Sequence, residues 1–276
     1  MTLIQELSEF QELFEFLNNL KSNYGRSIYY GEIATKQAII EPLIRLLGWN
    51  TSDIDEVYPE YRIDDTLEKV DFSLRLDRIN KFFIEVKKVR TKSLKKHEKQ
   101  LFDYCDKKET ELAVLTNGFI WWFYLPGKTD NWYKGKFYEI DIRRQDIGVV
   151  AHNFVDFLLK QNVKNGSFLK NAESVYKKII LTEELIFFIN SLPNSPVHAD
   201  FFAASLADKS EIEASNLLKN QPNNPQLKKL RNEFIKKEVL ESDYVIEDFI
   251  DSVECIHPFK VEADEVFEII ERLNFY

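Results

Sequence analysis

The chain has 276 residues with a formal net charge of −9, and 44% of them are hydrophobic, enough for one large core or two smaller ones. No stretch approaches the roughly 20 uncharged apolar residues of a membrane helix, and the acidic N-terminal stretch lacks the basic flank of a signal peptide. Two distant cysteines, Cys105 and Cys255, argue against a disulfide framework or a thiolate metal site. We therefore expect a soluble, cytoplasmic protein with no membrane contact.

The predicted elements begin with an amphipathic helix near residues 3–17. Its inward face is expected to carry apolar residues spaced three and four apart, namely Leu3, Leu7, Phe10, Phe14 and Leu17. Residues 19–27 contain a glycine and polar residues and predict a loop. A second helix is expected over residues 34–47, kinked by Pro42 and ended by Gly48.

The hydrophobic period then changes from that of a helix to that of strands. Three β-rich runs separated by turn formers predict a meander over residues 56–63, 69–76 and 81–89. A helix follows over 93–107. Two more strands, 111–116 and 119–125, flank Asn117-Gly118, a strong hairpin signal. A strand at 136–142 and a helix at 149–159 complete this part, and the order indicates a mixed α/β (α+β) fold.

A linker is expected at residues 164–166, and the chain beyond it is predicted to be mostly helical. The predicted helices cover residues 171–179, 182–192, 198–208, 210–218, 225–240 and 263–275. We therefore predict two domains, residues 1–165 and an acidic, helical domain over residues 166–276. The charge is divided in the same way, with a balance of −8 in residues 166–276 and of −1 in residues 1–165. The C-terminal helices are candidates for dimerisation or for binding a partner protein, and their charge argues against direct contact with nucleic acid.

One stretch of the first domain is strongly basic. Residues 86–100 contain seven lysines and arginines and a single acid, Glu98. Such a run is ordinarily a solvated helix face. Its alternative role is a surface that receives a polynucleotide.

Two carboxylates stand within apolar strands of the expected meander. Asp71 lies between Val70 and Phe72, and Glu85 lies two residues before Lys87 on the next strand. Burying an unpaired carboxylate is costly, and residues two apart on a strand share a face. The bland alternative is that these charges line a solvent-exposed strand face.

The three charged groups together suit the hydrolysis of a phosphodiester. Mg²⁺ prefers oxygen ligands, often one or two carboxylates completed by water or phosphate oxygens. A lysine beside such an ion would orient the attacking water or stabilise the charge developing at phosphorus. On this basis Asp71 and Glu85 are candidate metal ligands and Lys87 is a candidate catalytic lysine.

An ordered series of motifs resembles the N-terminal nuclease region of type I restriction enzyme R subunits and their free-standing relatives. The matching segments are IIEPLIRLLGW (39–49), VDFSL (70–74), FIEVKK (83–88), QLFDYC (100–105) and VLTNGFIWWFY (114–124). The resemblance implies a PD-(D/E)XK restriction-endonuclease-like core. It also implies an Mg²⁺-dependent endonuclease, with Mn²⁺ as a substitute ion, that acts on DNA in restriction-modification or a related defence role.

The resemblance also implies roles for particular residues. Asp71, Glu85 and Lys87 take the acid, acid and lysine positions, and Gln100 and Tyr104 match the family's Q-x-x-x-Y motif. Gln100 and Tyr104, four apart, share one helix face and would hold a phosphate or a base edge, unless they are an ordinary helix seam. Lys96 and Lys99, on or near the same helical turn, are further candidates for binding the substrate. Glu41 is a third metal-ligand candidate, with a surface or capping role as the alternative.

Two departures from the family pattern limit what carries over. Val70 precedes Asp71 where the family name has proline, and EVKK stands where many relatives have EAKK. No G-x-x-x-x-G-K-[ST] motif occurs, so we expect no ATP site and no motor in this chain. A nuclease-fold binding module for DNA or a protein partner is the alternative to an enzyme, and an RNA-directed nuclease is a third possibility.

Overall fold

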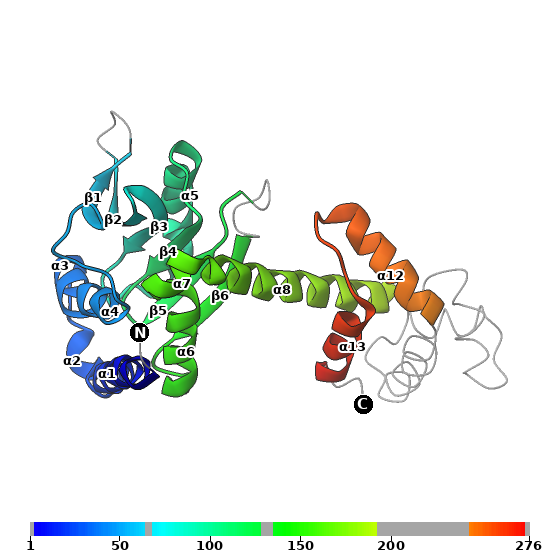
Figure 1. Cartoon of the computed structure of the whole chain (residues 1–276), viewed down its shortest axis with the longest axis horizontal. Coiled ribbons are helices and arrows are strands. Elements are labelled where there is room, and N and C mark those ends of the chain that lie inside the picture. The colour runs from blue at the N-terminus through cyan, green and yellow to red at the C-terminus, as the bar shows by residue number, and fades with distance from the viewer. Residues whose placement is uncertain (1–2, 64–67, 128–134, 192–242, 274–276) are drawn as a thin grey trace. The chain divides into compact units, whose positions relative to one another are not determined.

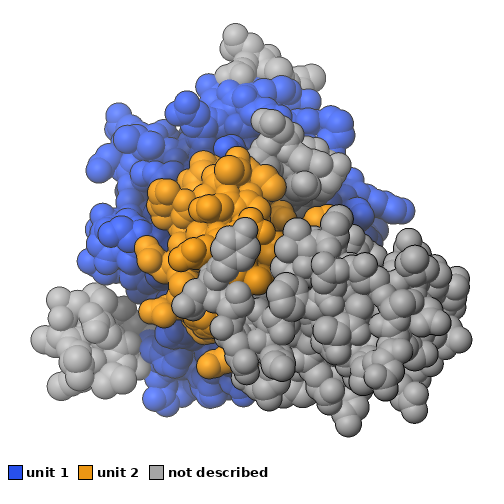
Figure 2. Space-filling view, turned by 90° about the vertical axis from the view of Figure 1, so that its right-hand side faces the viewer, with its two compact units in different colours: residues 1–176 blue, residues 177–276 orange. Residues whose placement is uncertain are grey.

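The computed structural model describes residues 3–63, 68–127, 135–191 and 243–273 (Figure 1). The chain forms two compact units, Met1–Tyr176 and Lys177–Tyr276, which Figure 2 colours separately. At the predicted linker, Gly166 adopts a left-handed φ of 75° between helix α7 (Lys160–Asn165) and helix α8 (Ser167–Ser191). The chain thus passes through the predicted linker as the end of α7 and one left-handed glycine, which caps α7 and redirects the chain into α8.

A six-stranded sheet with the strand order β1 to β6 forms the centre of the first unit (Figure 1). Its strands are β1 (Val57–Arg62), β2 (Lys69–Leu76), β3 (Ile79–Val86), β4 (Leu112–Thr116), β5 (Ile120–Tyr124) and β6 (Lys136–Asp141). Neighbouring strands are antiparallel except β3 and β4, which are parallel because helix α5 (Glu98–Lys107) carries the chain across between them. The predicted mixed α/β class is confirmed at this level.

Side chains from helices cover both faces of the sheet. Phe82 and Phe83 are adjacent on β3 and point to opposite faces, and both are fully buried. Phe83 joins a cluster that includes Leu101 of α5. The ring of Phe82 instead meets those of Trp49 and Phe168, at centroid distances of 5.9 and 5.3 Å. Strand β3 is therefore an interior strand, and its few polar residues are buried with it.

Helix α1 (Leu3–Ser22) contacts helices α4 (Glu41–Leu46) and α6 (Ile147–Leu158). From residue 10 onward its buried side chains are Leu13, Leu17 and Leu20, whereas Phe10 and Phe14 are 37% and 38% exposed. The side chains of Leu3 and Leu7 lie outside the described part of the helix. The predicted inward face was therefore wrong for the two phenylalanines. The spacing rule fits the neighbouring leucine stripe equally well, and the position of α4 and α6 selects between the two stripes.

The loop expected over residues 19–27 is also wrong. Helix α1 continues to Ser22, and a further helical turn, α2 (Tyr24–Ser27), follows it. The ring of Tyr24 packs edge-on against Phe119 at 4.8 Å, and the guanidinium of Arg143 lies 5.5 Å from its centroid. These distant contacts order a segment whose composition alone favours a loop.

The second predicted helix is formed in three parts. They are α3 (Glu32–Thr35), a π-helical turn η1 (Lys36–Ile40) and α4, which ends just before Gly48 with its φ of 85°. The wide turn comes directly before Pro42, whose ring would otherwise clash with the carbonyl oxygen of Ala38 four residues earlier. The sequence predicted a kink at Pro42, and the structure shows a wider helical turn directly before it.

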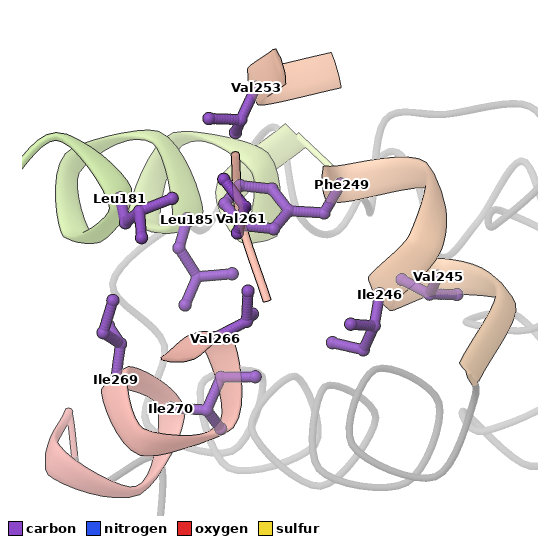
Figure 3. Close-up of a cluster of buried hydrophobic side chains, with 10 residues drawn as sticks. All are labelled: Leu181, Leu185, Val245, Ile246, Phe249, Val253, Val261, Val266, Ile269 and Ile270. Atoms are coloured by element: carbon purple, nitrogen blue, oxygen red, sulfur yellow. The ribbon is translucent and has the colours of Figure 1, made fainter. Parts of the chain in front are cut away.

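The second unit has a hydrophobic core of its own (Figure 3). Leu181 and Leu185 of α8 pack with Phe249 of α12 (Asp243–Ile256) and with Val266 and Ile269 of α13 (Ala263–Arg272). The sequence predicted α8 as two helices and α13 as one, and it missed α12. The helices predicted between residues 198 and 240 lie outside the described residues. No described helix is long and apolar enough to cross a membrane.

Candidate active site

The two strand carboxylates are brought to adjacent positions on β2 and β3. Phe72 pairs with Ile84 at the end of the antiparallel ladder, and Asp71 and Glu85 are the next residues along each strand. Both residues are buried. Asp71 Oδ2 accepts a hydrogen bond of 2.6 Å from the backbone N–H of Val86. The carboxylate of Asp71 is therefore fixed against the strand that carries Glu85.

Lys87 lies on the same side of its strand as Glu85, as the spacing of two residues predicts. Its ammonium lies 2.6 Å from Glu85 Oε1, and its backbone N–H donates to the carbonyl of Thr116 on β4 at 2.7 Å. The structure thus brings Asp71, Glu85 and Lys87 together. They do not form the solvent-exposed strand face that was the alternative.

Glu85 is the least satisfied charged group of the site. Its Oε2 is buried and accepts no hydrogen bond from any described residue. Burial, and then the negative charge of Asp71, raise the pKa of Glu85 to about 7, although Lys87 acts in the opposite direction. A buried carboxylate oxygen without a donor is the feature expected where a cation completes the site.

A second lysine, which the sequence analysis missed, reaches the site from η1. Lys36 forms ion pairs with Asp71 Oδ1 and with Glu60 Oε1, the latter at 2.8 Å. Burial would lower the pKa of Lys36, but its bonds to Asp71 and Glu60 outweigh burial and raise it. Lys36 is the only lysine of the helix expected over residues 34–47, which is too weak a signal to identify it.

The preceding helix brings a different acid toward the site from the one expected. The charge of Glu32, four residues before Lys36 on the helix, contributes to the raised pKa of Glu85. Glu41 begins α4 and is half-buried. No hydrogen bond or ion pair joins Glu41 to Asp71 or Glu85 in the described part of the chain. Its role as a metal ligand stays a prediction.

Gln100 and Tyr104 share one face of α5 and are bonded to each other. The amide of Gln100 donates to the hydroxyl of Tyr104 at 2.5 Å. Burial raises the pKa of Tyr104 to about 12, and the charges of Glu85 and Asp71 contribute to this shift. The hydroxyl of Tyr104 is therefore close enough to the two carboxylates for their charges to act on it.

The two lysines expected to bind substrate are exposed near the start of α5. Lys99 forms an ion pair of 2.7 Å with Asp103, and Lys96 lies beside His97. Burial, followed by the charges of Lys87 and Lys96, lowers the pKa of His97. The imidazole of His97 therefore lies close enough to Lys87 and Lys96 for their charges to disfavour its protonation.

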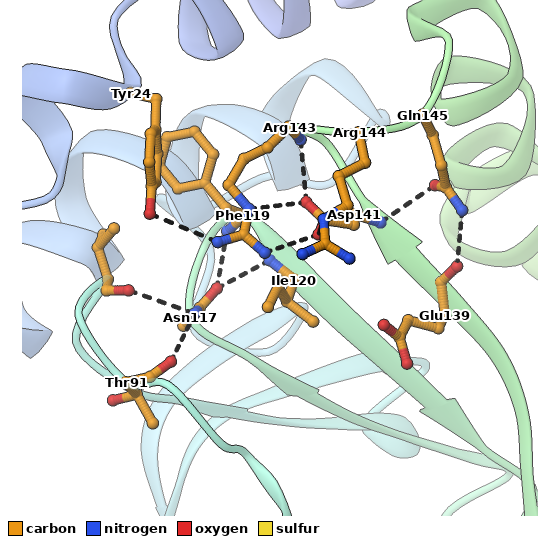
Figure 4. A network of polar contacts seen from close by, with 11 residues as sticks. Tyr24, Thr91, Asn117, Phe119, Ile120, Glu139, Asp141, Arg143, Arg144 and Gln145 are labelled. Carbon is orange, nitrogen blue, oxygen red and sulfur yellow. Dashed lines mark hydrogen bonds and ion pairs between the residues drawn. The ribbon is translucent and has the colours of Figure 1, made fainter.

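The loop that follows β3 is held by Asn117 (Figure 4). Its Nδ2 donates to the carbonyls of Val89 and Thr91 at 3.3 and 3.2 Å. Its Oδ1 accepts from the backbone N–H groups of Phe119 and Ile120 at 3.1 and 2.8 Å. One side chain therefore closes the β4–β5 turn and also fixes the start of the basic stretch directly after Lys87.

The side chain of Arg143, just after β6, also supports the β4–β5 turn. Arg143 donates two hydrogen bonds to Asp141, at 2.8 and 2.6 Å, and a longer one of 3.4 Å to the hydroxyl of Tyr24 (Figure 4). Tyr24 in turn packs on Phe119. These contacts tie α2 to the turn that carries Asn117.

The residues present fit a divalent cation of the Mg²⁺ type. Two carboxylates converge, one with a buried oxygen that has no donor, and oxygen ligands are what Mg²⁺ requires. In the described residues there is no group of three or more His, Cys, Asp or Glu side chains that could hold a metal. Protein ligation would therefore come from Asp71 and Glu85, with the remaining positions left to water or substrate.

Comparison of the chain with protein-family models, with curated proteins and with solved structures finds no match.

Proposed function

We propose that the chain is an Mg²⁺-dependent endonuclease of the PD-(D/E)XK type that hydrolyses DNA phosphodiester bonds in a restriction or defence role. The observation that carries the proposal is the convergence of Asp71 with the Glu85–Lys87 pair at facing positions of β2 and β3, with one carboxylate oxygen lacking a donor. The order of helix, three strands, helix and strand around this point supports the PD-(D/E)XK assignment.

Each side chain has a role that follows from its placement. Asp71 and Glu85 would hold Mg²⁺, or Mn²⁺ in its place, through their oxygens. The bound ion would lower the pKa of a water molecule and offset charge at the phosphate. Lys87, already beside Glu85, would orient that water or stabilise the charge that develops on the phosphate oxygens. Gln100 and Tyr104 would position the substrate from α5.

The basic stretch supports a polynucleotide as the substrate. Residues 86–100 follow the site directly, and Lys96 and Lys99 are exposed there. Lysines that neutralise backbone phosphates supply affinity without sequence selectivity. Because this stretch begins beside Lys87, a strand bound along it would pass the two carboxylates.

Nicking of supercoiled plasmid DNA in Mg²⁺ tests the proposal. Glu85→Gln removes the charge of a ligand and Lys87→Met removes the ammonium, so each should lower the rate by about 100-fold or more. Glu109→Gln and Lys164→Met make the same chemical changes at exposed positions and should cut like the wild type. Full activity in both site variants would refute the assignment.

A nuclease-fold binding module is the second candidate, and one observation favours it. Both carboxylates are already paired with lysines, Asp71 with Lys36 and Glu85 with Lys87. A module that binds DNA or a protein partner without cutting needs no ion at these oxygens. Titration with Mg²⁺ by calorimetry separates the enzyme from the binding module. Only the enzyme requires Mg²⁺ uptake, and this uptake should be lost in Glu85→Gln.

A further inference from the structure

Lys36 has two carboxylate partners with different positions in the site. One is Asp71, a proposed ligand, and the other is Glu60 on β1, at 2.8 Å. The Lys36 side chain is 15% exposed and that of Asp71 is 10% exposed, whereas that of Glu60 is 54% exposed. The ammonium thus lies between a buried acceptor and an exposed one.

Unusual backbone geometry lies on both sides of this ammonium. Lys36 begins the π-helical turn η1, and single π-helical turns are frequent at functional sites. Glu60 has a φ of 49° although it is neither a glycine nor part of a hairpin turn. The other non-glycine residues with positive φ, Asp77 and Arg78, form the tight turn between β2 and β3. Strain at Glu60 persists only where surrounding contacts hold it, and such positions cluster at functional sites.

Each of the two proposed ligands already has an ammonium beside it. Lys36 pairs with Asp71, and Lys87 pairs with Glu85. A divalent cation bound by both carboxylates would have to displace an ammonium from Asp71. An ammonium has three donors on a flexible stem and can change acceptors without movement of the backbone.

We propose that Lys36 is the resident cation of Asp71 in the metal-free protein and passes to Glu60 when a divalent cation binds, which keeps its ammonium beside the ion as a second contact for a substrate phosphate. This inference rests on the proposed function, because it requires that Asp71 is a metal ligand. Lys36 and the ion compete for Asp71, and Glu60 favours the ion by providing the lysine with an alternative partner. Lys36 is therefore a positioning residue of the metal site.

Calorimetric titration of the full-length chain with Mg²⁺ tests the competition directly. Lys36→Met removes the competitor and should tighten Mg²⁺ binding by about tenfold, equivalent to about 1.4 kcal/mol. Glu60→Gln removes the alternative acceptor and should weaken binding several-fold. In the Lys36→Met/Glu60→Gln double variant, the second substitution should have no further effect on Mg²⁺ affinity, because Lys36 is no longer there to pair with Glu60.

Lys69 provides the matched control. It lies 4.0 Å from Glu60 and is more exposed than Lys36, so Lys69→Met removes the same charge near the site without touching Asp71. We expect it to leave Mg²⁺ affinity within about twofold of the wild type. Equal tightening by Lys69→Met and Lys36→Met would overturn the inference, because the effect would then be one of general charge.

Other outcomes separate this inference from the proposed function. If the wild type binds Mg²⁺ while Lys36→Met and Glu60→Gln leave its affinity unchanged, the exchange of partners is wrong and the nuclease assignment stands. If no variant binds Mg²⁺ or Mn²⁺, both proposals fail. Should Lys36→Met lose its cooperative thermal unfolding, Glu60→Gln alone decides, since its substitution is at a more exposed side chain.

Discussion

At the scale of single residues, the energetic cost of burying a charge conflicts most directly with the proposed chemistry at Glu85. Its side chain is 4% exposed, and one of its oxygens lacks a donor. A carboxylate in this position lowers the stability of the metal-free fold when it is ionised. The same property would make it a strong ligand for the proposed cation. The site is therefore expected to be less stable when empty than an uncharged version of it.

The pH dependence of unfolding tests this expectation in metal-free protein. The pKa of Glu85 is raised from 4.5 to about 7, so its contribution to stability is present below pH 4.5 and is lost as the pH rises through 7. Glu85→Gln should therefore be more stable than the wild type by about 1–3 kcal/mol at pH 8. The difference should vanish near pH 4.5, where the carboxyl of the folded wild type is neutral. Denaturant unfolding in a chelator measures it, and an equal difference at both pH values would contradict the raised pKa.

The sequence identified some of these residues and not others, for a physical reason. Asp71, Glu85 and Lys87 could be predicted because a charge within an apolar strand is conspicuous and the period of a strand fixes its side. Lys36 and Glu60 could not, since their roles depend on a π-helical turn and on a left-handed backbone conformation. Neither of these follows from residue spacing.

At the scale of elements, the loop after β3 depends on the turn between β4 and β5. Asn117 donates to the carbonyls on either side of Arg90 while its oxygen accepts from the turn amides. The exposed Arg90 side chain lies over the ring of Tyr29 at 4.9 Å. The sequence signal for a hairpin thus marks a residue that also fixes the basic stretch.

Asn117→Asp separates these two roles. An aspartate keeps the acceptor for Phe119 and Ile120 but loses the donor to Val89 and Thr91 and places a negative charge against their carbonyls. We expect faster hydrogen exchange at the amide of Thr91, which bonds to Lys88, and little change at the amide of Ile120. Unchanged exchange at Thr91 would show that other contacts hold the loop.

The strands and the hairpin could be predicted because alternation and turn chemistry are local properties. The sheet order contains one non-local feature, the parallel pairing of β3 with β4, which the sequence order left open. The errors in the first two helices also arise from contacts between residues far apart in the sequence. Helix α2 forms because Tyr24 meets Phe119 and Arg143, and the buried stripe of α1 is selected by the helices packed against it. Composition alone cannot supply such contacts.

At the scale of the whole molecule, the two units differ in charge and each has a core of its own. Residues 166–276 carry a net charge of −8, and the basic stretch lies in the first unit. The core of the second unit is made from α8, α12 and α13 (Figure 3). A polyanion is therefore expected to bind the first unit.

Matched cavities in the two cores test whether the candidate site belongs to the first unit alone. Leu185→Ala in the second core and Leu101→Ala on the buried face of α5 should each cost about 2–5 kcal/mol within its own unit. Leu185→Ala should reduce exchange protection in α12 and α13 and leave Mg²⁺ affinity unchanged. Leu101→Ala should weaken Mg²⁺ binding, because α5 packs against the strand that carries Glu85. Equal loss of affinity in both variants would contradict this separation.

The hydrogen bond from the Val86 amide to Asp71 gives this side chain a second role, because it links strands β2 and β3. Loss of DNA cleavage in an Asp71 variant would therefore be ambiguous. It could result from a shifted strand or from the loss of a metal ligand. Glu85 and Lys87, whose side chains bond to each other, are the more informative targets. Substitutions at Glu85 and Lys87 are therefore the first choice for a variant that lacks the proposed activity but keeps the fold.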